Sequence, residues 1–144
     1  MKVLMAEELI SVREHLSGLL SEARNIDLRF IGQDATLLLQ VAAAWLPDVV
    51  ILDARMRGSM TLAVMEALKK QLPATAVVVS AFFYEPYYRE AYIRHGADFF
   101  FDKSLEWKEL IAFLRKCEAQ VLSESEGTPC AASQVGPHNA AVAS

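Results

Sequence analysis

The hydrophobic positions along the chain alternate between short continuous runs and longer segments with helical spacing. Several of the short runs, such as VVIL and VVV, contain no polar residue, which is typical of strands that are buried on both faces. We therefore predict a strand at each of five short runs. These are KVLMA (2–6), DLRFIG (27–32), VVILD (49–53), AVVVS (76–80) and DFFFD (98–102).

The segments between the runs place apolar residues three and four positions apart, as one buried helix face requires. The pattern is clearest over 9–23 and 110–121. Three middle helices are predicted at about 34–45, 60–71 and 85–95. Typical helix signals mark their ends, since Asp34 can cap a helix start, Pro86 suits a first turn and Gly96 can follow a helix end.

Strands that alternate with helices indicate βα units and a parallel sheet. Five such units fit the flavodoxin-like, doubly wound α/β fold, with strand order 2-1-3-4-5 and helices on both faces. In this winding, ligands bind outside the carboxyl ends of the strands, near the switch point between strands 1 and 3. Functional side chains are therefore expected at that edge.

The length of 144 residues suits one domain, which we place at 1–122. From 123 to 144 the chain is rich in small and polar residues and contains almost no large apolar ones. Such a segment cannot offset its ordering entropy by burial, so we expect a disordered tail or the stub of a linker.

Charge and hydropathy exclude several classes of function. A formal net charge of -4 gives no electrostatic reason to bind nucleic acid. The first residues lack the apolar core of a signal peptide, and no stretch has the length of a membrane span. We therefore expect a cytoplasmic protein without a nucleic-acid or membrane partner.

Polar residues of particular types follow the predicted strands at their carboxyl ends. They are Glu7 and Glu8 after the first strand, Asp53 after the third, Ser80 after the fourth and Lys103 after the fifth. Three carboxylates at one edge raise one another's pKa or require a cation, and magnesium fits this ligand type. With a lysine and a hydroxyl nearby, the set suits phosphoryl transfer, with Asp53 as nucleophile and with Ser80 and Lys103 holding phosphoryl oxygens.

Each of these residues also has a simpler interpretation. Asp53 could cap a turn, the Glu7–Glu8 pair could form the acidic first turn of a helix, and Lys103 could be an ordinary solvated residue. The combination favours a site, because four of the five strand ends carry the required chemical type at one edge of the sheet.

At these residues the chain resembles the receiver domain of bacterial two-component response regulators (the CheY-like family) over roughly 1–122. The matching pieces are VLMAEE, LPDVVILDARM, VVVSA and GADFFFDKS, in the family's order and spacing. The resemblance implies phosphorelay signalling with magnesium (or manganese) as cofactor. It also implies a sensor histidine kinase or phosphotransfer protein as partner, and no role as a dedicated enzyme.

The resemblance implies a role for each matching residue. Asp53 matches the phosphoacceptor, Ser80 and Lys103 match the phosphoryl-stabilising pair, and Phe100 matches the aromatic switch. Glu7, Glu8, Asp53 and the backbone carbonyl of Arg55 match the metal ligands. The family's surface for dimerisation or partner docking is formed by the fourth helix, fifth strand and fifth helix, where Tyr88 and Tyr92 lie four residues apart.

The chain departs from the family pattern at several positions. The acidic pair is Glu-Glu where at least one Asp is usual, and Arg57 and Thr61 replace the usual Pro and Gly. Ser104 stands where many members have a cis-Pro, which makes a cis peptide bond improbable. Arg55 and Arg57 could either tune Asp53 or point into solvent as exposed loop residues.

The function that fits best is a single-domain response regulator that accepts a phosphoryl group on Asp53 and signals by protein–protein contacts, unless the chain is part of a longer regulator. The departures leave a pseudo-receiver open, an interaction module that is not phosphorylated. A phosphatase of the haloacid dehalogenase kind is disfavoured, because that group carries Asp-x-Asp after its first strand and this chain carries Glu-Glu.

Overall fold

The fold is a five-stranded parallel sheet between two layers of helices, seen in a computed structural model that describes residues 1–82 and 85–123. The strands are β1 Lys2–Ala6, β2 Asp27–Ile31, β3 Val49–Asp53, β4 Ala76–Ala81 and β5 Phe99–Asp102. The helices are α1 Ile10–Leu19, α2 Ala35–Trp45, α3 Thr61–Gln71, α4 Pro86–Arg94 and α5 Trp107–Leu122. The order β2-β1-β3-β4-β5 confirms the predicted winding.

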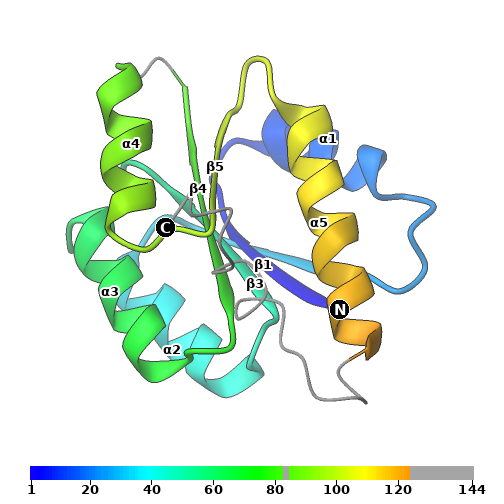
Figure 1. The fold of residues 1–144 in the computed structure, drawn as a ribbon, viewed down its shortest axis with the longest axis horizontal. Coiled ribbons are helices and arrows are strands. Elements are labelled where there is room, and N and C mark those ends of the chain that lie inside the picture. Colours follow the sequence, from blue (N-terminus) through cyan, green and yellow to red (C-terminus); the bar gives the residue numbers. More distant parts are fainter. Residues whose placement is uncertain (83–84, 124–144) are drawn as a thin grey trace.

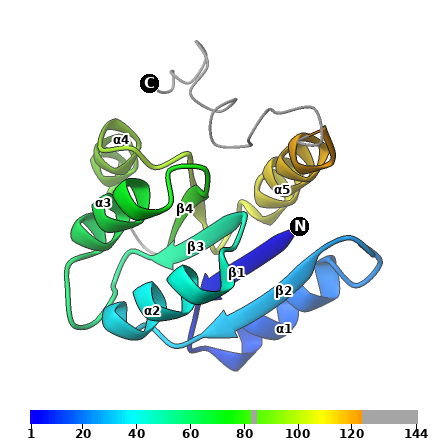
Figure 2. The same cartoon turned by 90° about the horizontal axis from the view of Figure 1, so that it is seen from below.

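The two helix layers divide unequally between the faces of the sheet. Helices α2, α3 and α4 cover one face, and α1 and α5 cover the other (Figure 1). In Figure 2 the strands run between these two groups of helices. None of the helices in the described part of the chain is long and apolar enough to cross a membrane.

The central strands supply the core of both layers because their side chains alternate between the two faces. Leu52 and Phe100 contribute to the core under α2, α3 and α4, whereas Ile51 and Phe101 contribute to the core under α1 and α5. Every residue of β3 and β4 is buried. This double burial explains the unbroken apolar runs in the sequence.

The predicted elements agree with the structure apart from their ends. The first helix ends at Leu19 and not at 23, since the chain continues in turns that include a hydrogen bond from Ala23 N to Leu20 O (3.0 Å). The last helix begins at Trp107 and not at 110, and the Trp107 ring packs edge-on against Phe101. The predicted tail lies outside the described residues from 124 onward.

The signals at helix ends act as expected. The Asp34 side chain accepts a hydrogen bond from Leu37 N (2.8 Å) and caps α2, and Pro86 occupies the first turn of α4. Gly96 follows α4 with a φ of 113°, a conformation that is costly for a residue with a Cβ. All peptide bonds in the described residues are trans, including the one that precedes Ser104.

Two glycines provide a test of this local analysis, because a Cβ would meet no atom within 4 Å at either Gly18 or Gly96. Gly96→Ala should lower the free energy of unfolding by about 1–2 kcal/mol, since only the backbone conformation opposes the methyl group. Gly18→Ala, within helix α1, should raise it by about 0.5 kcal/mol. Urea denaturation of both variants measures the difference, and equal effects would contradict the assignment.

Candidate functional site

The site centres on a buried lysine that binds two carboxylates. The Lys103 ammonium donates hydrogen bonds to Glu7 Oε1 and Asp53 Oδ2, both at 2.6 Å. All three residues are almost fully buried, with Lys103 the most exposed at 3%. The structure thus brings Lys103 together with one residue of the predicted acidic pair and with the predicted phosphoacceptor.

The sheet holds these side chains in place through its buried strands. Glu7 directly follows β1, Asp53 ends β3 and Lys103 directly follows β5. Lys103 N donates to Ala81 O at 2.9 Å, and the Trp107 indole donates to Lys103 O at 2.7 Å, so the lysine backbone is fixed on both sides. The position of the site therefore depends on the register of the whole sheet.

The second oxygen of Asp53 faces the loop that follows β3. Asp53 Oδ1 accepts a hydrogen bond from Arg55 N at 2.7 Å. The Arg55 guanidinium lies farther off, with Nε 3.8 Å from Oδ1, and its side chain is 76% exposed. The Arg55 backbone therefore orients Asp53, while its charge is screened by water.

Thr61 closes the same loop, a role that the sequence analysis did not assign to it. Its buried hydroxyl donates to Asp53 O at 2.9 Å and accepts from Met56 N at 3.2 Å. The sequence marked Thr61 only as a departure from the usual Gly, because a hydroxyl at that position has no characteristic spacing to the backbone it binds.

Ser80 lies beside Asp53 in the parallel register of β3 and β4. Its buried hydroxyl donates to Leu52 O at 2.9 Å. A rotation about χ1 would redirect the hydroxyl, since serine has three staggered rotamers. Ser80 is therefore close to the predicted phosphoacceptor and bonded to the backbone in this structure.

Glu8, the second residue of the acidic pair, does not join Glu7 and Asp53. Its Oε2 accepts hydrogen bonds from the Arg57 guanidinium and from Gln33 N (3.2 Å). The hydrogen bond and charge of Arg57 lower the pKa of Glu8 from its usual 4.5 to about 2. Arg57 thus interacts with Glu8 and not with Asp53.

This arrangement corrects the expectation of three carboxylates at one point. Within residues 1–82 and 85–123 no group of three or more acidic, histidine or cysteine side chains converges as a metal site would. The physical reason is that each carboxylate already has a basic side chain as its partner. Lys103 pairs with Glu7 and with Asp53, and Arg57 pairs with Glu8. The oxygen donors still match those that magnesium prefers, and Glu8 would have to leave Arg57 to join them.

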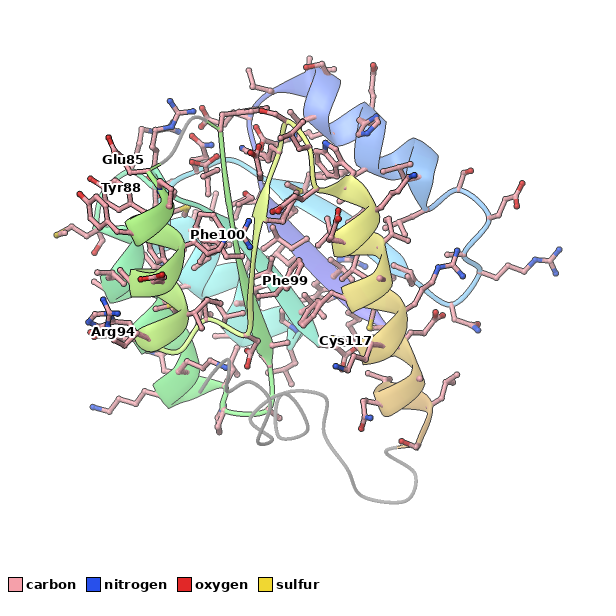
Figure 3. The ribbon with its side chains drawn as sticks, turned by 45° about the horizontal axis from the view of Figure 1, so that its top comes forward. Glu85, Tyr88, Arg94, Phe99, Phe100 and Cys117 are labelled. Carbon is pink, nitrogen blue, oxygen red and sulfur yellow. The ribbon has the colours of Figure 1, made fainter. Side chains whose placement is uncertain are left out.

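A cavity of about 280 Å³ opens beside Asp53 toward α4. Phe100 is 1% exposed and stacks on Tyr92, with 5.8 Å between ring centroids. Figure 3 shows Phe100 on the α4 side of β5 and Phe99 on the α5 side. The cavity is lined by Asp53, Ala54, Arg55, Ala81, Phe82, Tyr88, Tyr92 and Phe100.

The two tyrosines of the predicted partner surface differ in their surroundings. Tyr88 is exposed and stacks on Tyr87, with ring centroids 4.4 Å apart. Tyr92 packs against the core under α4, and burial raises the pKa of its phenol. Tyr88 is therefore available at the surface, whereas Tyr92 mainly connects α4 to Phe100.

Comparison with known proteins adds a family and a set of similar folds. A family model described as the response regulator receiver domain matches residues 3–115 of the chain. The signal receiver domain of NarL from Mycobacterium tuberculosis is 26% identical, with a TM-score of 0.68, and the match covers 81% of this chain and 94% of that one. No curated protein sequence matches the chain.

Two other response regulators of known structure have a similar fold. The DNA-binding response regulator of the LuxR family from Staphylococcus aureus is 22% identical, with a TM-score of 0.68 and coverage of 80% of this chain and 96% of that chain. NtrX from Brucella abortus is 26% identical, with a TM-score of 0.68, and the match covers 79% of this chain and 26% of NtrX. The fold therefore also occurs as one part of a longer protein.

Replacing Lys103 tests whether it holds the site together. Lys103→Met would leave two buried carboxylates without a counter-ion, so the free energy of unfolding should fall by about 3–5 kcal/mol. Lys116→Met, at an exposed position of α5, should change it by no more than about 0.5 kcal/mol. Guanidinium denaturation measures both.

A double variant separates charge from packing at the same position. Glu7→Gln combined with Lys103→Met should recover part of the lost stability, because only one buried carboxylate then remains unpaired. A Lys103→Met variant as stable as Lys116→Met would contradict the pairing.

Proposed function

The chain belongs to the family of response regulator receiver domains, and on that premise we propose that Asp53 accepts a phosphoryl group from a phosphohistidine of a sensor kinase or phosphotransfer protein. Membership implies two-component phosphorelay signalling, and receiver domains are signalling modules and not dedicated enzymes. The observation that carries the proposal is the buried contact of Lys103 with both Glu7 and Asp53.

The proposed chemistry is a transfer between two nucleophiles. An Asp53 carboxylate oxygen attacks phosphorus, a P–O bond forms, the P–N bond to the donor histidine breaks, and the histidine leaves in its neutral form after taking up a proton. The Lys103 ammonium lies 2.6 Å from Asp53 Oδ2. After the transfer it can donate its hydrogen bond to a negatively charged phosphoryl oxygen instead. Ser80 can donate to another once its hydroxyl leaves Leu52 O.

Receiver domains generally bind magnesium at the phosphorylation site. In this chain Glu7, Glu8, Asp53 and the Arg55 carbonyl would hold it, and the metal would neutralise charge on the transferring phosphoryl group. Burial of Asp53 among apolar strands excludes bulk water from most of the carboxylate, which strengthens each of these interactions.

A phosphoryl donor must reach this edge of the sheet, so we propose that the kinase or phosphotransfer protein docks over Asp53. Ile10 at the start of α1, Met60 before α3 and Leu105 before α5 are strongly exposed and available for contact with it.

The signal would leave the site through the α4 side. Phe100 and Tyr92 of α4 both line the cavity beside Asp53 and stack on each other, so a shift of Phe82 after phosphorylation would alter α4 packing. We therefore propose Phe100 as the aromatic switch. The exposed surface of α4, β5 and α5, including Tyr88, is the proposed site for a homodimer or a downstream protein.

The domain bounds, the location and the output of the protein complete the proposed function. We place the receiver domain at 1–122, and the matched range of 3–115 supports this choice. We propose a cytoplasmic regulator whose output is protein–protein contact, with no nucleic-acid partner of this domain. The net charge of -4 supports the last point.

One observation favours a second candidate, the pseudo-receiver. Glu8 is paired with Arg57, and the three carboxylates do not converge in the described residues. An interaction module that had lost phosphorylation would tolerate this arrangement, since it needs no metal.

Phosphorylation distinguishes the two candidates. After incubation with acetyl phosphate and magnesium, intact mass spectrometry should detect one added phosphoryl group, because Asp53 is the buried nucleophile beside Lys103. The Asp53→Asn variant keeps the side-chain shape and should acquire none. Absence of the adduct in the unsubstituted protein at every magnesium concentration would favour the pseudo-receiver.

A further inference from the structure

Arg57 is held in place by its backbone as well as by its charge. Arg57 N donates to Gln33 O at 2.7 Å, and Ala35 N donates to Arg57 O at 2.8 Å. These bonds join the loop after β3 to the loop after β2, and Asp34 and Arg57 pair as a short parallel bridge. The guanidinium is thereby positioned next to the Glu8 carboxylate.

The Glu8 carboxylate lies close against the backbone at Gly32, in a position that a side chain at residue 32 would crowd. A Cβ on Gly32 would lie 3.2 Å from Glu8 Oε2, which is closer than an ordinary van der Waals contact. Gln33 N, the next backbone amide, donates to the same oxygen at 3.2 Å. Gly32, Gln33 and Arg57 therefore form one binding seat for Glu8, away from Glu7 and Asp53.

The chain's own cations balance the charges of the site. Lys103 contacts Glu7 and Asp53, Arg57 contacts Glu8, and Arg55 lies at the outer side of Asp53. A divalent cation that needs Glu8 as a ligand must take it from Arg57, because Glu8 Oε2 already accepts hydrogen bonds from the Arg57 guanidinium and from Gln33 N.

We propose that Arg57 is a built-in competitor of the divalent cation for Glu8, so that the seat formed by Gly32, Gln33 and Arg57 weakens metal binding. The inference rests on the proposed function, because the cation concerned is the one that phosphorylation of Asp53 uses. As a consequence, a higher magnesium concentration is needed to fill the site.

The competition has a modest size that can be estimated. The Glu8 and Arg57 side chains are 40% and 58% exposed, and exposed ion pairs are weak. Loss of the seat should therefore tighten magnesium binding by about two- to fivefold, and not by orders of magnitude. Because the pair of Glu8 and Arg57 is weak, magnesium can still displace Arg57 from Glu8.

Magnesium titration calorimetry on the unphosphorylated protein tests the proposal. Gly32→Ala adds a methyl group against Glu8 Oε2 and changes no charge, and Arg57→Gln removes the guanidinium. Both should lower the magnesium Kd by about two- to fivefold. Arg115→Gln, an equal loss of charge at an exposed position of α5, should leave the Kd unchanged and keeps the test valid if Gly32→Ala proves unstable.

Gly18→Ala is the matched control for Gly32→Ala, because a Cβ at Gly18 meets no atom within 4 Å, and its Kd should equal that of the unsubstituted protein. Tighter binding by Arg57→Gln alone would show a long-range charge effect and overturn the proposal. Unchanged or weaker binding in both Gly32→Ala and Arg57→Gln, or no magnesium binding in any protein, would also overturn it.

The outcome is independent of phosphorylation. If the variants bind magnesium more tightly but no protein acquires a phosphoryl group, the competition stands and the proposed function fails. If the proteins are phosphorylated and the magnesium Kd values are equal, the proposed function stands and the competition fails.

Discussion

The shared ammonium group of Lys103 is the interaction on which the rest of the site depends. It lies 2.6 Å from carboxylates that follow or end two different strands, β1 and β3, while Lys103 itself follows β5. Burying any one of these charges alone would be strongly unfavourable. The three can be buried only together, and that requires the strands to be in the correct order and register.

The apolar strands explain how such a polar centre is tolerated. Strands β3 and β4 are buried on both faces, and their pairing places Asp53 next to Ser80. The burial of the strands therefore fixes the positions of both residues. A slip by one residue would turn every side chain to the opposite face. The stability of the hydrophobic layers is therefore what holds the Asp53 carboxylate beside Lys103.

The site combines a rigid part with an adjustable part. Lys103, Glu7 and Asp53 are buried, whereas Glu8 and Arg57 are exposed and their pairing is weak. Glu8 can therefore change its partner at little cost while the buried contacts keep Asp53 oriented, as the proposed metal binding would require. The aromatic contact of Phe100 with Tyr92 extends this rigid part toward α4.

Much of this arrangement was predictable from the sequence, because strand runs, helix periods and capping residues are local signals. The carboxyl-edge positions of Glu7, Asp53, Ser80 and Lys103 followed from the strand order alone. The direction of Glu8 did not, because it depends on Gly32, Gln33 and Arg57, which come from loops distant in sequence. The Glu-Glu pair and Arg57 were visible as departures, but their pairing required the folded loops.

A crystal structure with magnesium and beryllofluoride, which stands in for the phosphoryl group, tests the central role of Lys103 most directly. We expect beryllofluoride on Asp53, with the Lys103 ammonium within hydrogen-bonding distance of a fluorine atom. An unmodified Asp53, or an adduct with the Lys103 side chain turned into solvent, would contradict it.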